Sequence, residues 1–203
     1  MMNDTKFDVG GEFTHKGYTI NGWFFPANKR WYEKHATNIK NGIIVEIGVF
    51  GGASLLSVAD ICKDNNTQLY GVDTWELLEL KNGDRQTPEQ LKIFREGLKA
   101  QRLKLEKITN ELNYSHITLV KDFSMQAVHR FKDNSIDLIY LDASHDYKNV
   151  TQDLKSWFPK LKKNGILGGD DWGWPEVKRA VIDFCKKNNL KPIDKDNHWE
   201  IIF

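Results

Sequence analysis

Three aspartates and one histidine follow two short apolar runs, at positions where their side chains could meet. Asp142 and His145 come just after one run, and Asp170 and Asp171 come just after the other. If the runs are neighbouring parallel strands, the carboxylates converge, and they repel one another unless a cation lies between them. Oxygen ligands favour Mg²⁺, Ca²⁺ or Mn²⁺ over zinc. The alternative is that Asp170 or Asp171 caps a helix and Asp142 is solvated.

His145 lies three residues after Asp142 and can face the same hollow. Because an imidazole titrates near neutral pH, it is suited to taking a proton from a hydroxyl group that a metal ion has acidified. A lone histidine at a turn is more often a surface or capping residue. This role therefore depends on the aspartates being gathered at one point.

A glycine-rich turn follows an earlier apolar run, with Glu46 and Gly48 at its start and Gly51, Gly52 and Ser54 at its end. Glycines allow a sharp turn and the close approach of a ligand, and the helix that follows offers its amino end. The spacing is not that of the G-x-G-x-x-G dinucleotide fingerprint, and no P-loop lysine follows. The turn favours a nucleoside or nucleotide ligand.

Asp73 stands after the next apolar run, where a carboxylate can accept hydrogen bonds from both hydroxyls of a ribose. An aspartate at a strand end caps the next helix about as often. The glycine turn and Asp73 at consecutive strand ends together favour a ribose-bearing ligand.

Alternating strands and helices must position these residues. The short apolar runs predict strands, and the amphipathic stretches between them predict helices. Right-handed crossovers then place helices on both faces of a parallel sheet, and ligands bind at the carboxyl ends of its strands. The predicted strands are 42–48, 69–72, 116–120, 136–141 and 166–168, and the predicted helices are 54–62, 124–131, 149–161 and 176–188.

The carboxyl-terminal runs 191–194 and 199–203 flank a polar tract short enough for a hairpin. The predicted fold class is therefore α/β, a Rossmann-like, mainly parallel seven-stranded sheet with helices on both faces and an antiparallel last strand. Residues 42–203 form this domain, and residues 1–41 form an N-terminal helical extension with a helix near 28–39. A charged, helical insertion at 77–115 is either a lid or a solvated helix that covers the sheet edge.

Composition narrows the class of partner. The 203 residues include 40% hydrophobic and 12% aromatic residues, enough for one packed core. A net charge of +1 provides no field for nucleic acid or an anionic membrane, so we expect a small-molecule partner and leave a homo-oligomer open. Two distant cysteines are expected to be free thiols, and no stretch is typical of a signal peptide or membrane span. Both features predict a cytoplasmic protein.

The pattern Glu-x-Gly-x-x-x-Gly at 46–52, followed by Val-Asp-x-Trp at 72–75, resembles the opening of class I S-adenosylmethionine-dependent methyltransferases. Asp122-Phe123-Ser124 continues the resemblance, which covers roughly residues 42–203. It implies that Asp73 holds the ribose of S-adenosylmethionine and that Asp122 and Ser124 flank the adenine. The residues that it implies for the cofactor are Glu46, Gly48, Gly51, Ser54, Asp73, Thr74, Trp75, Asp122, Ser124 and Asp142.

Asp-x-x-His at 142–145, with Gly-Gly-Asp-Asp at 168–171, resembles the metal-dependent O-methyltransferases. It is most similar to the macrocin-type group, which methylates sugar hydroxyls. The resemblance implies that a divalent ion, Mg²⁺ first, sits on Asp142, Asp170 and Asp171 and acidifies an acceptor hydroxyl. His145 then takes the proton, and in-line transfer of the sulfonium methyl gives a methyl ether.

Two departures from that group concern the acceptor. Ala143-Ser144 replaces the glycine more usual after the first metal aspartate, and the N-terminal extension is much shorter. In catechol-type relatives a lysine corresponds to His145, and an asparagine commonly corresponds to Asp171. The N-terminal extension and the insertion are where the acceptor would be selected, so the hydroxylated small molecule stays open between a sugar and another natural product.

Three rival functions stay open. A NAD(P)-dependent oxidoreductase would use a similar sheet, although the glycine spacing argues against it. A catalytically idle cofactor-binding module would use the aspartates only as helix caps. A metal-independent methyltransferase acting on protein or RNA is disfavoured by the neutral charge. Trp75, Trp172 and Trp174, next to the strand ends, either shape the acceptor pocket or pack in the core.

Overall fold

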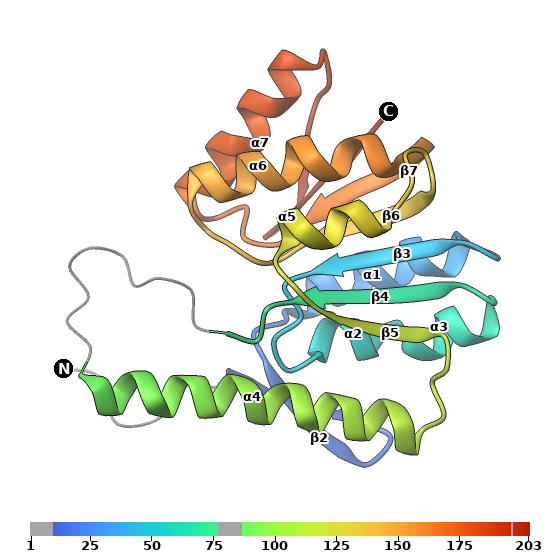
Figure 1. Cartoon of the computed structure of the whole chain (residues 1–203). Helices are drawn as coiled ribbons and strands as arrows, with labels where there is room; N and C mark the ends of the chain where they lie inside the picture. The colour runs from blue at the N-terminus through green and yellow to red at the C-terminus, as the bar shows by residue number, and fades with distance from the viewer. Residues whose placement is uncertain (1–9, 77–86, 196) are drawn as a thin grey trace.

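The computed structural model describes residues 10–76, 87–195 and 197–203, and its centre is a seven-stranded sheet (Figure 1). The strand order is β5-β4-β3-β6-β7-β9-β8. Neighbours from β5 to β7 pair in parallel, and β9 runs antiparallel to β7 and β8. The predicted fold class is confirmed. The strands are β3 (Ile43–Ile47), β4 (Gln68–Asp73), β5 (Ile117–Lys121), β6 (Ile136–Leu141), β7 (Leu161–Gly169), β8 (Ile193–Lys195) and β9 (His198–Ile202).

The strand order reverses between β3 and β6. Strands β4 and β5 lie on one side of β3, whereas β6 and β7 lie on its other side. Loops that leave adjacent strands at such a point diverge to opposite faces and open a crevice at the carboxyl edge. The predicted metal and ribose residues follow β4, β6 and β7. The topology alone therefore brings them to one edge of the sheet.

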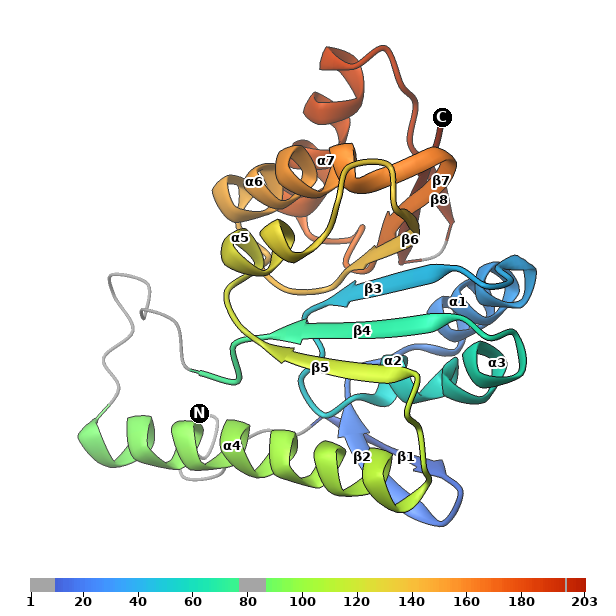
Figure 2. The same cartoon turned by 45° about the vertical axis from the view of Figure 1, so that its right-hand side comes forward.

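Helices cover both faces of the sheet, as Figure 2 shows. Helices α5, α6 and α7 pack with one hydrophobic cluster, and α1 to α4 pack with the other. Alternate residues of β3 serve the two clusters, with Val45 and Ile47 in one and Ile44 in the other, because successive strand side chains point to opposite faces. The helices are α1 (Pro26–Asn38), α2 (Ala53–Ser57), α3 (Ala59–Asp64), α4 (Pro88–Glu111), α5 (Ser124–Ala127), α6 (Tyr147–Trp157) and α7 (Pro175–Lys187).

Two predicted helices are shorter than the patterns indicated. The stretch 54–62 forms α2 and α3, which meet at Val58, where the backbone leaves helical geometry at φ −105° and ψ 0°. The stretch 124–131 forms α5 and a 3₁₀ turn, Val128–Arg130. Both keep their apolar side chains against the sheet, so the pattern identified the buried face although it missed the breaks.

The N-terminal segment contains a hairpin that the sequence analysis did not anticipate. Strands β1 (Gly11–His15) and β2 (Tyr18–Gly22) pair antiparallel through a two-residue turn at Lys16 and Gly17. Both turn residues have positive φ, 47° and 84°, which is the backbone of a type I′ hairpin. A linker then leads from β2 into α1, whose bounds fit the predicted helix near 28–39.

Within the insertion, α4 packs against the body of the domain. Thr87 and Gln90 form a capping box at its start, and Leu105 and Ile108 are buried in the second cluster. Tyr18 of the hairpin donates a hydrogen bond to Glu111 at the end of α4, 2.7 Å away. Residues 77–86 of the predicted insertion lie outside the described residues. No described helix combines the length and hydropathy needed to cross a bilayer.

Candidate active site

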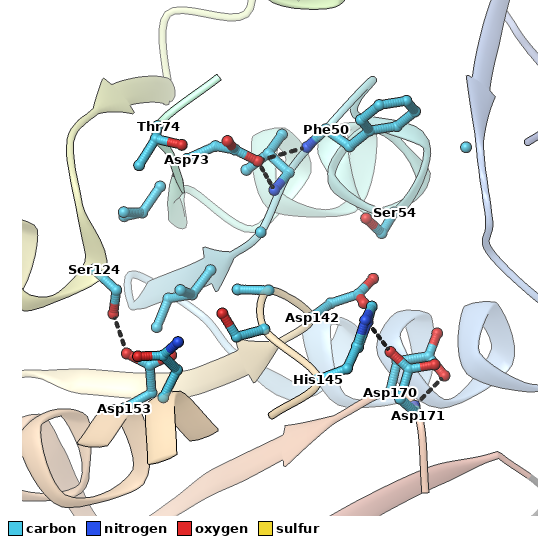
Figure 3. A pocket seen from close by; sticks show the side chains of 18 of the residues that line it. Phe50, Ser54, Asp73, Thr74, Ser124, Asp142, His145, Asp153, Asp170 and Asp171 are labelled. Carbon is cyan, nitrogen blue, oxygen red and sulfur yellow. Dashed lines mark hydrogen bonds and ion pairs between the residues drawn. The ribbon is translucent and has the colours of Figure 1, made fainter. Parts of the chain in front are cut away.

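A cavity of about 1030 Å³ lies at the carboxyl edge of the sheet, at the reversal between β3 and β6 (Figure 3). Its walls come from the loops after β3, β4, β5, β6 and β7 and from the β2–α1 linker. None of the described residues of α4 lines it. A cavity of this size accommodates a nucleoside-sized cofactor together with a second small molecule.

Asp73, at the end of β4, organises the glycine turn. Its Oδ2 accepts hydrogen bonds from the backbone N–H groups of Val49 and Phe50, both at 2.9 Å, and its Oδ1 accepts one from Trp75 N at 2.6 Å. Phe50 has φ +49°, an uncommon value for a bulky residue, and these bonds hold it there. Oδ1 keeps a second lone pair, so Asp73 can still accept a hydrogen bond from a ribose.

Three glycines of the turn are needed because the chain itself packs against them. A Cβ at Gly48 would lie 1.9 Å from the carbonyl oxygen of Asp142, and one at Gly51 would lie 2.2 Å from that of Asn21. At Gly52 it would lie 2.6 Å from Leu105 of α4. The glycine turn is therefore clamped by β2, α4 and the end of β6. Sequence reasoning ascribed the glycines to the approach of a ligand and gave no sign of these contacts.

Glu46 is fully buried in β3 and does not line the cavity. Its Oε1 accepts a hydrogen bond from Ser54 Oγ at 2.6 Å, and Ser54 does line the cavity. Burial raises the pKa of Glu46 to about 8, against the opposing effect of the Ser54 hydroxyl. Glu46 is thus mostly protonated at neutral pH and acts through the position of Ser54.

The end of the cavity after β5 holds Asp122 and Ser124, as the sequence predicts. Asp122 Oδ1 accepts a hydrogen bond from Phe123 N at 2.9 Å. Ser124 Oγ donates to Asp153 Oδ1 at 2.5 Å and accepts from Trp157 Nε1 at 2.7 Å. Burial raises the pKa of Asp153 to about 6. Asp153 was missed, although an aspartate on the apolar face of a helix is an available signal.

Asp142, His145 and Asp171 form an acidic cluster at the opposite end of the cavity (Figure 3). One ligand atom from each lies within 4.8 Å of the others, and His145 Nε2 is 2.7 Å from Asp171 Oδ2. Asp170 stands beside them, but its Oδ1 accepts hydrogen bonds from Asp171 N at 2.6 Å and Asn197 Nδ2 at 2.8 Å. The sequence predicted a ligand set of three aspartates, whereas the closest group contains the histidine.

The electrostatics of this cluster fit a cation. Burial, together with the carboxylates of Asp170 and Asp171, raises the pKa of Asp142 well above its usual value. Burial also raises the pKa of Asp170 to about 6, and the amide of the fully buried Asn28 opposes that rise. Carboxylates that repel one another in a buried site are stabilised by a divalent ion, and carboxylate oxygens suit Mg²⁺ or Mn²⁺.

Backbone and ring contacts hold the cluster in place. Asp171 has φ +64°, and its carbonyl accepts a hydrogen bond from Trp174 N at 2.8 Å. The Trp174 ring stacks on the ring of His145, with 4.9 Å between centroids and 18° between planes. The positive φ of Asp171 and the ring stacking fix the directions in which Asp171 and His145 point.

The three tryptophans noted in the sequence differ in location. Trp75 and Trp172 are buried, and Trp75 Nε1 donates to the carbonyl of Phe50 at 2.7 Å, so both serve the core. Trp174 is exposed and lines the cavity. Trp23 and Phe25 of the β2–α1 linker also line it, and sequence reasoning did not single them out.

Of the residues predicted for the cofactor, Gly48, Gly51 and Ser54 line the wall after β3, and Asp73 and Thr74 line the wall after β4. Asp122, Ser124 and Asp142 line it from the strands beyond. Glu46 and Trp75 stand behind the cavity wall. Where the cofactor and the ion lie among these residues stays a prediction.

A sequence model of the family described as "Methyltransferase domain" matches residues 45–172, from within β3 to just past Asp171. The chain belongs to this methyltransferase family. The matched span takes in every predicted ligand of the cofactor and the ion. The chain therefore carries a methyltransferase domain, in agreement with the resemblance to the class I S-adenosylmethionine-dependent methyltransferases.

Solved structures share the fold. The O-methyltransferase NovP matches with a TM-score of 0.65 at 14% identity, over 86% of this chain and 79% of that one. The calicheamicin methyltransferase CalS11 matches with a TM-score of 0.58 at 17% identity, over 87% and 77%. SMU.1697c from Streptococcus mutans, in complex with SAH, matches with 0.59 at 12% identity, over 85% and 96%. At these identities the likeness concerns the fold alone.

The curated relative "Uncharacterized protein y4gI" of Sinorhizobium fredii (strain NBRC 101917 / NGR234) is 25% identical over 127 residues. The match covers 61% of this chain and 12% of that protein, so the chain spans only a small part of its relative.

Proposed function

We propose that this methyltransferase methylates a hydroxyl group of a small molecule. In this proposal a divalent cation acidifies the hydroxyl group, and His145 takes its proton. The observation that carries the proposal is the acidic cluster of Asp142, His145 and Asp171, which shares one cavity with the glycine turn and Asp73. Cofactor groups and acid–base groups on opposite walls of one cavity are what a transfer reaction needs. A helix-capping role would not require the buried carboxylates to converge.

The chain's own residues have separate tasks in this reaction. Asp73 and the clamped glycine turn hold the nucleoside and aim the sulfonium, and Ser124 with Asp153 bounds the opposite end of the cavity. Asp142, Asp170 and Asp171 would hold the cation, which would lower the pKa of a hydroxyl group near it. Asp171 fixes the imidazole of His145, which takes the proton of the acceptor hydroxyl.

The net charge and the neighbours in fold support the proposed acceptor class. The net charge of +1 does not favour a nucleic acid. NovP is described as an O-methyltransferase and CalS11 as a TDP-rhamnose 3′-O-methyltransferase, which support an oxygen acceptor on a small molecule such as a sugar. The buried, unpaired thiols of Cys62 and Cys185 support a reducing, cytoplasmic setting.

The test is turnover of S-adenosylmethionine to S-adenosylhomocysteine with a panel of hydroxylated acceptors. We expect turnover to require Mg²⁺ or Mn²⁺, to stop with EDTA, and to fall at least about 100-fold in Asp142→Asn and His145→Gln. Cofactor affinity, measured by calorimetry, should persist in His145→Gln and so exclude misfolding. Full activity in EDTA or in these variants would refute metal-assisted O-methylation and leave a metal-independent reaction.

A further inference from the structure

Exposed tryptophan in this protein is confined to the cavity. Of the seven tryptophans, Trp23 and Trp174 are each 52% exposed, and both line the cavity. The other five, at most 7% exposed, are Trp31, Trp75, Trp157, Trp172 and Trp199. Large aromatic surface left in contact with water at a cavity indicates a place where a ligand covers it.

The wider set of exposed apolar side chains shows the same bias. Eight large apolar side chains are exposed among the described residues, and five of them line the cavity. The five are Trp23, Phe25, Phe123, Met125 and Trp174. Phe123 and Met125 follow β5, at the end assigned to the adenine, which leaves the other three for a second molecule.

Trp174 stands beside the acidic cluster, and Trp23 and Phe25 stand on the linker that runs towards it. The Trp174 ring stacks on His145. Trp23 and Phe25 belong to the β2–α1 linker. The Trp23 ring lies 5.3 Å from that of Phe50 in the glycine turn, and Asn28, three residues beyond Phe25, lies beside Asp170. The linker therefore passes from the cofactor side of the cavity to the cation side, where the methyl acceptor must lie.

The cavity is lined by seven acidic residues, and no lysine or arginine lines it among the described residues. The acidic residues are Asp73, Glu76, Asp122, Asp142, Asp153, Asp170 and Asp171. Of the seven, Glu76 pairs with Lys121 and Asp122 with Arg130, and a divalent ion and the sulfonium of the cofactor would add three more positive charges. A phosphate or carboxylate on the acceptor would still enter a negative field, and the described lining has no lysine or arginine to pair with it.

We propose that Trp23, Phe25 and Trp174 form the acceptor site, and that it takes a hydroxylated ring that is uncharged or positively charged. The flat face of such a ring, saturated or aromatic, packs on an indole, and a positive charge gains from both the rings and the carboxylates. Acceptors that carry phosphate or carboxylate are rejected. This sets the chain apart from CalS11, which is described as acting on TDP-rhamnose, and it rests on the proposed hydroxyl acceptor.

The test measures ring binding to the protein loaded with S-adenosylhomocysteine and Mg²⁺, by calorimetry and saturation-transfer NMR. One pair of probes is saturated, methyl rhamnoside against TDP-rhamnose, and the other is aromatic, dopamine against protocatechuic acid. We expect the uncharged or cationic member of at least one pair to bind about tenfold or more tightly than its anionic partner. The pair that binds distinguishes a sugar from an aromatic acceptor.

Variants assign that binding to the aromatic residues. Trp23→Ala and Trp174→Ala should each weaken ring binding about tenfold, and Trp174→Phe should keep most of it. Leu103→Ala, 47% exposed on α4 and outside the cavity, is the matched control and should bind as the unaltered protein does. S-adenosylhomocysteine affinity should stay the same in all four variants.

Equal or tighter binding of the anionic members would overturn the inference. So would unchanged ring binding in Trp23→Ala and Trp174→Ala, or the absence of binding by every uncharged and cationic probe. Repeating the titrations without Mg²⁺ separates this inference from the proposed function. Ring binding that needs Trp23 and Trp174 but ignores Mg²⁺ would keep the acceptor site and overturn the role of the cation.

Discussion

Glu46 provides a quantitative test of the burial at the centre of this fold. It is 0% exposed, and its pKa rises from 4.5 to about 8 because burial disfavours the charged carboxylate. The unfolded chain releases this proton at lower pH than the folded chain. The stability that protonated Glu46 contributes is therefore fully present below about pH 4.5 and is lost as the pH rises towards 8. At about 1.4 kcal/mol per pKa unit, the total loss is roughly 5 kcal/mol.

The substitution Glu46→Gln removes this titration and keeps the shape of the protonated side chain, including the oxygen that accepts from Ser54. In urea unfolding of the cofactor-free protein, the free energy of unfolding of the variant should therefore rise relative to that of the unaltered protein as the pH rises. From pH 5 to 9 we expect the gain to be roughly 4 kcal/mol, most of it below pH 8. Glu12→Gln, at an exposed glutamate of β1, is the control and should show a constant difference.

A difference between Glu46→Gln and the unaltered protein that is the same at pH 5 and pH 9 would refute this reasoning, because Glu46 would then titrate alike in both states. The result also bears on the site. The charge of Glu46 is one of the influences that raise the pKa of Asp142, after burial and the carboxylates of Asp170 and Asp171. A neutral Glu46 therefore helps Asp142 to be an anion.

Three further predictions concern the glycine turn and the cavity walls. Gly48→Ala should lower the free energy of unfolding in urea by more than about 3 kcal/mol, because its Cβ would lie 1.9 Å from a backbone oxygen. Gly17→Ala, with φ +84° and open space around the Cβ, should lower it by only about 1 kcal/mol. Equal losses in the two variants would show that φ alone matters. Asp73→Ala should weaken S-adenosylhomocysteine binding about 10- to 100-fold by calorimetry, and unchanged affinity would exclude Asp73 from the ribose site. For Asp153→Asn, the free energy of unfolding should rise by roughly 2 kcal/mol relative to the unaltered protein between about pH 4 and pH 6, because the pKa of Asp153 rises from 3.8 to about 6; a flat difference would contradict this.

The sequence predicted the sheet because buried parallel strands are continuous apolar runs. The run around Val45 and the run around Ile139 each correspond to one strand, and the residues just after them occupy the carboxyl edge whatever the loops do. The amino-acid pattern was therefore enough to place Asp73, Asp122 and Asp142 at that edge, where the cavity lies. Their placement depends on topology rather than on side-chain detail.

Long-range contacts could not be predicted in this way. The Lys16-Gly17 turn was not recognised as a hairpin, so Trp23 and Phe25 had no predicted element to position them. The glycine turn carries no local sign that Asn21 and Leu105 press on it. Likewise, no local pattern shows that Asn197, 27 residues along the chain, donates a hydrogen bond to Asp170, or that His145 belongs to the closest cluster.

The acidic cluster is tested most directly by Mn²⁺ binding to the protein loaded with S-adenosylhomocysteine, followed by electron paramagnetic resonance. We predict one saturable ion per chain, displaced by Mg²⁺, with the site lost in Asp142→Asn and in Asp171→Asn but retained in Glu12→Gln. The absence of saturable Mn²⁺, or equal binding in the two aspartate variants, would contradict a cation centre in this cavity.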